Sequence, residues 1–255
     1  MKPALMTAGV GVRFGGHKVV DDVTCAFVEG TLTAIVGPNG AGKTTFFNLL
    51  SGHTEATEGD VFLFGERVTN WPPSKRAQRG LGRGFQLTSL FPRLSAHENV
   101  RLAVQSRRGV RWSFLSTWSS HRNLIEEADS ILLRTGLQAH RDAPAGALSH
   151  GDQRKLDVAV LTALAPKIFL FDEPTAGMSA DEVPLVLDLI AGLKAEGGHT
   201  ILLVEHKMDV IGQLADRVIV LHQGALAADG DIDTVVSSDL VQQVYLGRAR
   251  CSGHP

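Results

Sequence analysis

Four short apolar runs dominate the hydrophobic pattern of the chain, and polar or turn-forming residues bound each of them. They are LTAIVG at residues 32–37, IFLF at 168–171, ILLV at 201–204 and VIVL at 218–221. Continuous apolar runs of this length are typical of strands buried on both faces, as in a parallel sheet covered by helices. We therefore expect these runs to form a central parallel sheet.

Helical patterns lie between these runs, at about residues 43–51, 181–195 and 207–214. Strands that alternate with helices indicate βαβ units and an α/β fold. The early part of the chain differs, because the alternation in HKVVDDVTCAFVEG follows the pair Gly15 and Gly16. This pattern is typical of a hairpin, so we expect an antiparallel β layer beside the parallel sheet.

The pattern changes again after about residue 93. Ser95 and Glu98 make a capping box at the start of a helix. A second helical run covers about residues 123–135 and ends at Gly136. No strand signal occurs between these helices, which indicates a helical subdomain inserted into one α/β domain. The expected boundaries are about 1–92 and 157–255 for the core and about 93–156 for the helical subdomain.

Composition and charge narrow the possible functions. The 255 residues carry a formal net charge of −2, which gives no electrostatic reason to expect nucleic acid as a partner. Cys25 and Cys251 form neither a disulfide framework nor a zinc pattern, which favours a reducing compartment. The apolar runs are far shorter than the roughly 18 residues that span a bilayer, and the N-terminus lacks a secretory signal pattern. We therefore expect a cytoplasmic protein whose contact with any membrane is peripheral.

The sequence GPNGAGKTT at residues 37–45 follows the first apolar run and begins a helix. In this strand–loop–helix context the pattern is that of a P-loop, whose glycines let backbone N–H groups surround phosphates. Lys43 would reach the terminal phosphates, and the Thr44 hydroxyl would bind Mg²⁺. A glycine-rich turn with a surface lysine is the alternative. The predicted nucleotide-binding residues of the loop are Gly37, Pro38, Asn39, Gly40, Ala41, Gly42, Lys43, Thr44 and Thr45.

Two carboxylates, Asp172 and Glu173, follow the apolar run IFLF directly. A carboxylate at the end of a buried strand beside the P-loop strand is well placed to hold Mg²⁺ through its water, so we assign Asp172 to the metal. Glu173 is then free to orient and deprotonate an attacking water. The alternative is that both residues only end the strand, with Pro174 making the turn.

A second helix start rich in small and polar residues lies at LSHGDQRKL, residues 148–156. Exposed backbone N–H groups at a helix start attract anions, and small residues let a phosphate approach closely. Because the P-loop already provides one phosphate site, the second start needs its own explanation.

Together these motifs resemble those of the ATP-binding-cassette ATPases. GPNGAGKTT, the signature-like LSHGDQ and IFLFDEPTAG occur in that family's order and approximate spacing, and Gln86 in GFQ and His206 in LLVEH complete the set. The resemblance covers essentially the whole chain. It implies a RecA-like P-loop NTPase core with an antiparallel β layer and an inserted helical subdomain, and ATP and Mg²⁺ as cofactors.

The resemblance also explains the second helix start. In this family two copies pack head to tail, and each ATP lies between the P-loop of one chain and the signature helix of the other. Ser149, Gly151, Asp152 and Gln153 are therefore expected to hold the γ-phosphate bound by a partner, with the Ser149 hydroxyl and the Gly151 N–H as donors. A chain with one P-loop and one signature has to pair with a second ATPase subunit, in a homodimer or a heterodimer.

Three further residues receive roles by matching motif. Gln86 resembles the Q-loop glutamine, which touches Mg²⁺ and water and relays to the transporter, and His206 resembles the switch histidine, which contacts the γ-phosphate. Phe14 matches the aromatic residue that stacks on adenine. The alternatives are a polar residue after a strand, a structural histidine and a core phenylalanine, respectively. The resemblance thus implies catalytic roles for Glu173, His206 and Gln86, and metal contacts for Thr44, Gln86 and Asp172.

Two positions depart from the family pattern. His150 stands where the signature usually has glycine, which would alter the donor geometry or add a titrating group near phosphate. Ser179 stands where the family commonly has aspartate, and with Glu182 it matches a capping box, so a structural explanation is open. Pro184 argues against a helix start there, because a proline beyond the first turn removes a helical hydrogen bond.

Longer segments are similar to the ATPase subunits of branched-chain amino acid importers, among them RFGGHKVVDDV, GRGFQLTSLFPRLSAHENVRLAV and FDEPTAGMSADEV. The resemblance implies an ATP-hydrolysing energy-coupling subunit that binds permease subunits on the inner face of the cell membrane. It also implies an indirect partner, a periplasmic or lipid-anchored substrate-binding protein. Related subunits serve urea, amides and some aromatic acids, and the cargo is not written in an ATPase chain.

Two other functions compete with transport. A soluble, non-transport member of the superfamily usually has tandem cassettes or a long coiled-coil insertion, and a P-loop kinase leaves LSHGDQ and His206 without a role. The stretch RRGVRWSFLSTWSSHRN at residues 107–123 has Trp112, Leu115 and Trp118 at every third position between basic residues. A membrane or transporter contact and a packed loop of the helical subdomain both fit this pattern.

Overall fold

A six-stranded sheet forms the centre of the chain, whose structure is a computed structural model that describes residues 2–84, 90–109, 122–206 and 208–238. The strand order is β10-β9-β3-β8-β7-β6, and every neighbouring pair is parallel except β10 and β9. The predicted parallel sheet is therefore confirmed. Its strands are β3 (Leu32–Val36), β6 (Leu81–Gly84), β7 (Ile168–Asp172), β8 (Thr200–Val204), β9 (Arg217–His222) and β10 (Ala225–Gly230).

An antiparallel sheet forms a second layer, in the order β2-β1-β4-β5. The hairpin between its first two strands turns at Gly15 and Gly16, whose φ values of 52° and 89° favour glycine. The predicted hairpin layer is confirmed. The strands are β1 (Pro3–Phe14), β2 (His17–Val28), β4 (Glu58–Leu63) and β5 (Glu66–Arg67).

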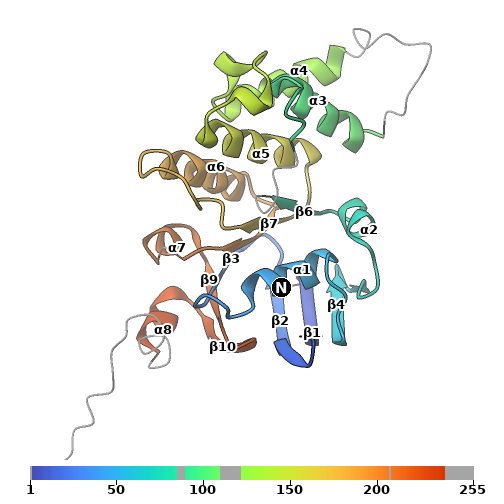
Figure 1. Ribbon diagram of the computed structural model, residues 1–255, viewed down its shortest axis with the longest axis vertical. Helices are drawn as coiled ribbons and strands as arrows, with labels where there is room; N and C mark the ends of the chain where they lie inside the picture. Colours follow the sequence, from blue (N-terminus) through green and yellow to red (C-terminus); the bar gives the residue numbers. More distant parts are fainter. Residues whose placement is uncertain (1, 85–89, 110–121, 207, 239–255) are drawn as a thin grey trace, which may run out of the picture.

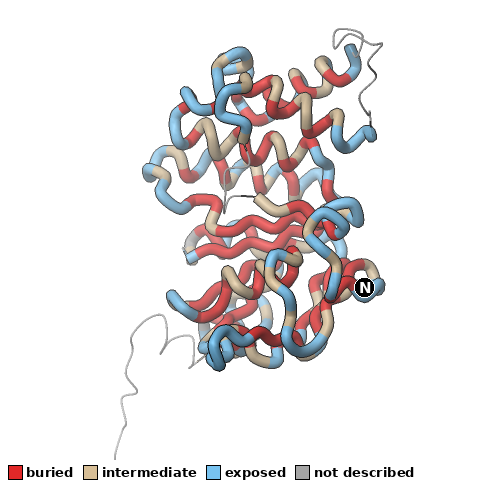
Figure 2. The backbone as a smooth tube through the Cα atoms, turned by 45° about the vertical axis from the view of Figure 1, so that its right-hand side comes forward, coloured by how far each residue is buried: buried red, intermediate tan, exposed pale blue. Residues whose placement is uncertain are grey.

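The helix α1 (Lys43–Ser51) lies between the two sheets (Figure 1). Phe46, Phe47 and Leu50 of α1 are fully buried in one apolar cluster with residues from both sheets. In Figure 2 the buried residues, coloured red, run through the central strands and the elements packed beside them. This packing fixes the start of α1, and with it the P-loop, against the carboxyl ends of the parallel strands.

Helices cover the other face of the parallel sheet. α5 (His150–Leu164) and α6 (Val183–Glu196) pack on β7 and β8, while α7 (Met208–Leu214) and α8 (Ile232–Ser237) pack beside β3 and β9. The short helix α2 (Pro73–Gln78) precedes β6. Helices on one face and a second sheet on the other give the expected α/β architecture.

A helical cluster stands beyond α6 and is formed by α3 (Ala96–Arg107), α4 (Arg122–Arg134) and α5 (Figure 1). It includes two 3₁₀ turns, Gln138–His140 and Ala145–Ala147. Among the described residues between 93 and 155 no strand occurs, apart from one isolated bridge. The boundary expected near residue 156 falls within α5, whose residues contribute both to this cluster and to the core beneath α6. The subdomain boundary therefore stays a prediction.

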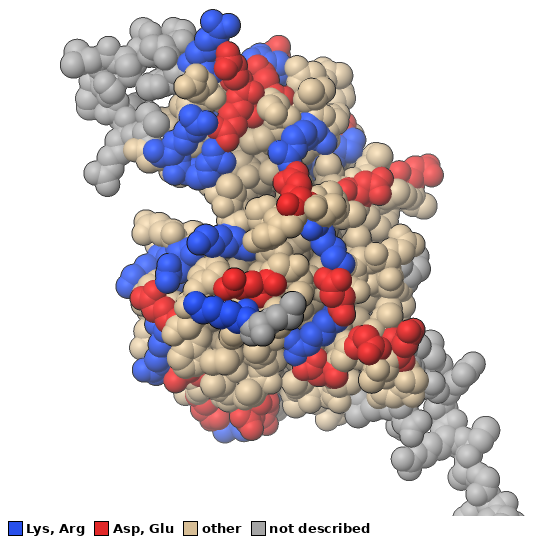
Figure 3. Space-filling model, turned by 180° about the vertical axis from the view of Figure 1, so that it is seen from behind, with Lys and Arg blue, Asp and Glu red and all other residues tan. Residues whose placement is uncertain are grey.

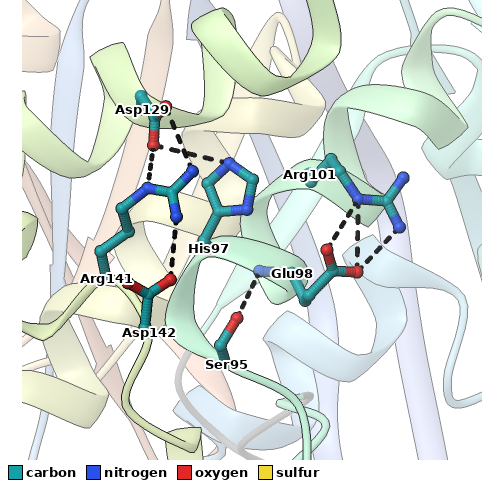
Figure 4. Close-up of polar contacts among 7 residues, drawn as sticks. All are labelled: Ser95, His97, Glu98, Arg101, Asp129, Arg141 and Asp142. Carbon is teal, nitrogen blue, oxygen red and sulfur yellow. Dashed lines mark hydrogen bonds and ion pairs between the residues drawn. The ribbon is translucent and has the colours of Figure 1, made fainter. Parts of the chain in front are cut away.

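Polar contacts hold this helical cluster together (Figure 4). Ser95 caps α3, because its hydroxyl accepts from the Glu98 N–H at 3.1 Å, as the capping box predicted. Asp129 of α4 accepts from Arg141 Nε at 2.7 Å, and the buried His97 Nε2 lies 3.5 Å from the same carboxylate. These contacts join α3, α4 and the segment that leads into α5.

The predicted start of α6 near residue 181 is wrong by two residues. α6 begins at Val183, so Pro184 lies in the first turn, where its missing N–H costs nothing. Ser179 and Glu182 still interact, because the Ser179 N–H and hydroxyl donate to Glu182 Oε2 at 3.1 and 2.9 Å. These hydrogen bonds form in the turn before the helix rather than at its cap. None of the helices within the described part of the chain is both long and apolar enough to cross a bilayer.

Candidate functional site

The loop between β3 and α1 has a backbone that only glycine tolerates at several positions. Gly40 and Gly42 have φ values of 80° and 94°, in the left-handed region. A Cβ atom on Gly42 would lie 2.5 Å from the Val19 carbonyl oxygen, and one on Gly37 would clash with the Leu221 carbonyl. The loop is thereby held tightly against the ends of the sheet, while its outer side at Asn39 and Gly40 stays exposed.

The start of α1 is open to an anion. Its N-cap residue, Gly42, provides no side-chain cap. In the loop the Ala41 N–H donates to Pro38 O at 3.1 Å, and the first N–H of the helix with a partner is that of Phe46, which donates to Gly42 O at 2.8 Å. No described residue accepts from the N–H groups of Lys43, Thr44 and Thr45. Three converging N–H groups at the positive end of a helix make a phosphate site.

Lys43 folds back across this opening. Its Nζ donates to the carbonyl oxygens of Gly37 at 2.7 Å and Pro38 at 3.0 Å, and the residue is only 6% exposed. Burial lowers the pKa of Lys43, and the nearby carboxylates of Glu173 and Asp172 oppose that shift. The ammonium group is therefore presented at the loop next to the two acidic residues.

Asp172 ends β7 and is buried beside α1, where it pairs with an arginine that the sequence did not single out. Arg83 Nη2 of β6 donates to Asp172 Oδ2 at 2.9 Å, and Nη1 reaches Asn48 Oδ1 at 2.6 Å and Ser51 Oγ at 2.9 Å. Burial raises the pKa of Asp172, and Arg83 opposes this shift. Arg83 thus connects the strand before Gln86 to α1 and to the acidic strand end.

Glu173 and His206 meet at the edge of the same site. Glu173 has a φ of 52°, an unusual value for a residue with a side chain, and its N–H donates to Val204 O at 3.0 Å. His206 Nε2 lies 2.8 Å from Glu173 Oε1, and the two side chains are 37% and 39% exposed. An acid and a histidine in contact, both accessible to solvent, can position and deprotonate a water molecule.

The start of α5 is capped by its own chain. The Ser149 hydroxyl accepts from the Asp152 N–H at 3.1 Å and donates to Asp152 Oδ2 at 2.9 Å. The carboxylate of Glu182 fills the space beside Gly151, where a Cβ atom would clash with it. Lys155 pairs with Asp152 at 2.9 Å, and Gln153 Nε2 donates to Leu148 O at 3.1 Å.

The structure gathers the predicted residues into two groups. Within the described residues, no hydrogen bond or ion pair joins the start of α5 to the loop at residues 37–45. Phe14 is 51% exposed at the end of β1, so the alternative of a core phenylalanine is wrong, while its contact with adenine stays a prediction. His150 is exposed. Gln86 and residues 110–121 lie outside the described residues.

Two further residues belong to the group around the loop at 37–45, and they were not predicted from the sequence. Arg83 and Glu205 are both charged and largely buried; Arg83 lies in the short strand β6 and Glu205 directly follows β8. A charged residue at the edge of an apolar or glycine-rich run is the one signal that could have marked them, because such residues are rarely buried without a partner.

Comparisons with known proteins agree with this geometry. The family model described as ABC transporter matches residues 20–176, more than half of the chain. The chain is 36% identical to the high-affinity branched-chain amino acid transport ATP-binding protein BraF of Pseudomonas aeruginosa, over 97% of this chain and 99% of that protein. It is 34% identical to the corresponding protein LivG of Escherichia coli K12, with the same coverage.

Solved structures show the same fold. A nucleotide-free ATP-binding cassette from an ABC transporter superposes with a TM-score of 0.82 and 28% identity, over 97% of this chain and 100% of that one. The ADP conformation of an ATP-binding cassette gives a TM-score of 0.82 and 27% identity, with the same coverage. The parallel core, the antiparallel layer and the helical cluster are therefore those of an ATP-binding cassette, and the chain belongs to the ABC transporter family.

Proposed function

We propose that the chain hydrolyses Mg-ATP and so supplies the energy for an ABC importer. The observation that carries this proposal is the convergence of four side chains at the carboxyl end of the parallel sheet: the Lys43 ammonium beside the uncapped start of α1, the buried Asp172, and the contacting pair Glu173 and His206. Together they can bind a triphosphate and activate water.

Binding of ATP uses the loop and the first turn of α1. The free N–H groups of Lys43, Thr44 and Thr45 donate to the phosphate oxygens, and the Lys43 ammonium exchanges its carbonyl partners for the terminal phosphates. Phe14, exposed at the end of β1, is available to stack on adenine.

Mg²⁺ fits the donors present. The residues that would hold it are Thr44, Asp172 and Gln86, which offer hydroxyl, carboxylate and amide oxygens, the ligands that this ion prefers. Among the described residues no cluster of three or more His, Cys, Asp or Glu side chains could hold a metal. A site of few protein ligands completed by phosphates is how Mg²⁺ usually binds with nucleotides. When bound, the ion neutralises charge that develops on the phosphates.

Hydrolysis requires a base beside the γ-phosphate. Glu173 is partly exposed and takes a proton from the attacking water, while His206 contacts both the Glu173 carboxylate and the γ-phosphate. Closure of the site is proposed to need a second ATPase subunit, whose Ser149, Gly151, Asp152 and Gln153 supply donors from the start of α5 in a head-to-tail homodimer or heterodimer.

The permease is proposed to dock in a groove beside the edge strand β6. The groove has a volume of about 880 Å³, and its apolar floor includes Leu164, which is 39% exposed. Arg79, Arg107 and Lys167 line it, and Figure 3 shows basic side chains on both sides of the hollow between the helical cluster and the core. An apolar floor with a basic rim suits a short membrane-protein segment with acidic ends.

The cargo is proposed to be branched-chain amino acids. BraF and LivG, which match this chain over nearly their whole length, are both described as branched-chain amino acid transport proteins. The chain would then work at the inner face of the cell membrane, with a periplasmic or lipid-anchored protein delivering the amino acid to the permease.

Two measurements test the proposal. The purified chain should release phosphate from ATP only with Mg²⁺, and EDTA should abolish the activity. Extraction of membranes with detergent should co-purify the chain with a polytopic permease, and Leu164→Arg should weaken that association without reducing ATP binding. Phosphate release that ignores Mg²⁺, or a chain that never accompanies a membrane protein, would contradict the proposal.

A further inference from the structure

The carboxylate of Glu205 lies between the two turns that carry Glu173 and His206. Glu205 directly follows β8, and Thr175 lies in the turn after β7, the neighbouring parallel strand. Glu205 is only 3% exposed. A buried carboxylate is costly unless donors reach it, so the donors around it indicate what it holds in place.

Three donors bind this carboxylate, and all of them come from the two turns. Oε1 accepts from the Thr175 hydroxyl and from the Thr175 N–H, the latter at 3.3 Å. Oε2 accepts from the His206 N–H at 2.9 Å. One side chain therefore joins the backbone two residues after Glu173 to the backbone of His206 itself.

The link matters because Glu173 and His206 do not hold each other firmly. Their contact of 2.8 Å is between partly exposed side chains, and such pairs contribute little by themselves. The left-handed backbone of Glu173, at a φ of 52°, also depends on its surroundings to persist. The Glu173 N–H also donates to Val204 O at 3.0 Å, which joins the two strand ends but does not reach His206 itself.

We infer that Glu205 is a positioning residue for ATP hydrolysis. Its carboxylate sets the distance and orientation between Glu173 and His206 through Thr175, and it touches neither the nucleotide nor the attacking water. This inference rests on the proposed function, because it concerns the same reaction at the same site.

A carboxamide cannot replace this carboxylate. In Glu205→Gln one oxygen becomes an NH₂ group, a donor that has to face either the His206 N–H or the Thr175 N–H. The change keeps the volume of the side chain and breaks the link on one side. Because small misplacements of reacting groups cost up to about 100-fold, we expect kcat to fall by about 10- to 100-fold while the Kd of the monomer for ATP is unchanged.

Threonine variants provide the matched control. Thr175→Val removes the hydroxyl that Glu205 accepts from and should lower kcat, whereas Thr175→Ser keeps a hydroxyl and should restore it. Thr69→Val removes another buried hydroxyl, one that accepts from the Val61 N–H at 3.0 Å in the antiparallel sheet. It should lower stability but leave kcat unchanged, which separates positioning from general destabilisation.

The decisive readout is the coupling to His206. If Glu205 acts by aligning His206 with Glu173, then His206→Ala should reduce kcat less in the Glu205→Gln background than in the wild type. Should Glu205→Gln fail to fold, the same cycle is measured with Thr175→Val. Additive losses, or a wild-type kcat in both variants, would overturn the inference. If the Lys43→Ala and Glu173→Gln variants instead release phosphate at the wild-type rate, the proposed function is overturned, and the inference with it.

Discussion

The two helix starts expected to bind phosphate, those of α1 and α5, are built differently. At α1 no side chain caps the helix, and the buried Lys43 lies across the opening. At α5 the Ser149 hydroxyl and Asp152 bind each other, and the Glu182 carboxylate fills the space beside Gly151. The first start is open to an anion within one chain, whereas acidic side chains of the same chain occupy the second.

This difference shows what turns a helix start into a binding site. In the sequence both starts have small residues before a helix. Only the start of α1 also lies beside a cation and the carboxyl ends of buried parallel strands. At α5 the local cation, Lys155, is already paired with Asp152. This contrast supports nucleotide binding by α1 within one chain and, in the proposed head-to-tail dimer, a role for α5 in a partner's site.

Lys43→Ala should have the largest effect on nucleotide binding at the start of α1. Without the ammonium group, the α1 site loses its cation for the β- and γ-phosphates, and ATP binding by the monomer should be abolished or nearly so. Titration of the monomer with a fluorescent ATP analogue measures this. The matched control is Lys155→Ala, which removes the lysine at the other helix start and should leave ATP affinity of the monomer unchanged. Wild-type affinity in Lys43→Ala would remove Lys43 from its role.

Glu173→Gln should separate binding from chemistry at the α1 site. The variant keeps the phosphate donors, so it should bind ATP normally, but hydrolysis should slow by about 10²- to 10⁴-fold, the usual contribution of a general base. Because the bound ATP is no longer hydrolysed, the ATP-bound dimer should persist and be detected by size-exclusion chromatography. Turnover at the wild-type rate would place the base elsewhere, with His206 the first residue to test.

Asp157 of α5 should have a smaller effect, on the pH dependence of stability. Burial raises its pKa to about 7, although Arg154 opposes this shift. The pKa of Asp157 in the folded state lies above the unfolded value of about 3.9, so the folded state binds the proton more tightly. The stability that this proton contributes to the folded chain is therefore lost as pH rises from about 4 to 7. Asp157→Asn should therefore stabilise the chain at pH 8 relative to pH 5 by on the order of 1–3 kcal/mol, or several degrees in Tm. If Tm changes by the same amount between pH 5 and pH 8 in the variant and in the wild type, the pKa of Asp157 is not raised by burial.

The parts of the molecule that were predicted from sequence depend on local pattern. The four apolar runs predicted β3, β7, β8 and β9, and α1 has the bounds expected for it, because strand burial and helix periodicity are encoded in neighbouring residues. The parallel edge strand β6 was not predicted, because its sequence LGRG has no apolar run. The start of α6 was misplaced because the spacing of Ser179 and Glu182 matches a capping box, although in the structure the two residues bind each other in the turn before the helix. Proline at the first turn, rather than the capping pattern, marked the true start.

The missed residues depend on contacts between distant parts of the chain. Arg83 binds Asp172, which lies 89 positions away, and Glu205 binds Thr175, 30 positions away. A one-dimensional pattern does not contain the parallel pairing of β6, β7 and β8 that brings these residues together. The candidate site was therefore predicted in its motif residues and not in the buried charges that hold them.

The central claim, that α5 acts on a partner's nucleotide, is tested most directly with Gly151→Asp. A charged side chain there opposes a phosphate, and its Cβ also displaces Glu182, so Glu182→Ala serves as the control that removes the Glu182 carboxylate from this position without adding charge at residue 151. The Gly151→Asp monomer should bind ATP like the wild type, while its homodimer turnover collapses.

Mixing Gly151→Asp chains with Lys43→Ala chains then completes the test. In the mixed dimer one composite site contains both changes and the other contains neither, so phosphate release should reappear when the two inactive proteins are combined. Loss of ATP binding in the isolated Gly151→Asp monomer, with no recovery of phosphate release on mixing, would contradict the account and assign the start of α5 to the chain's own site.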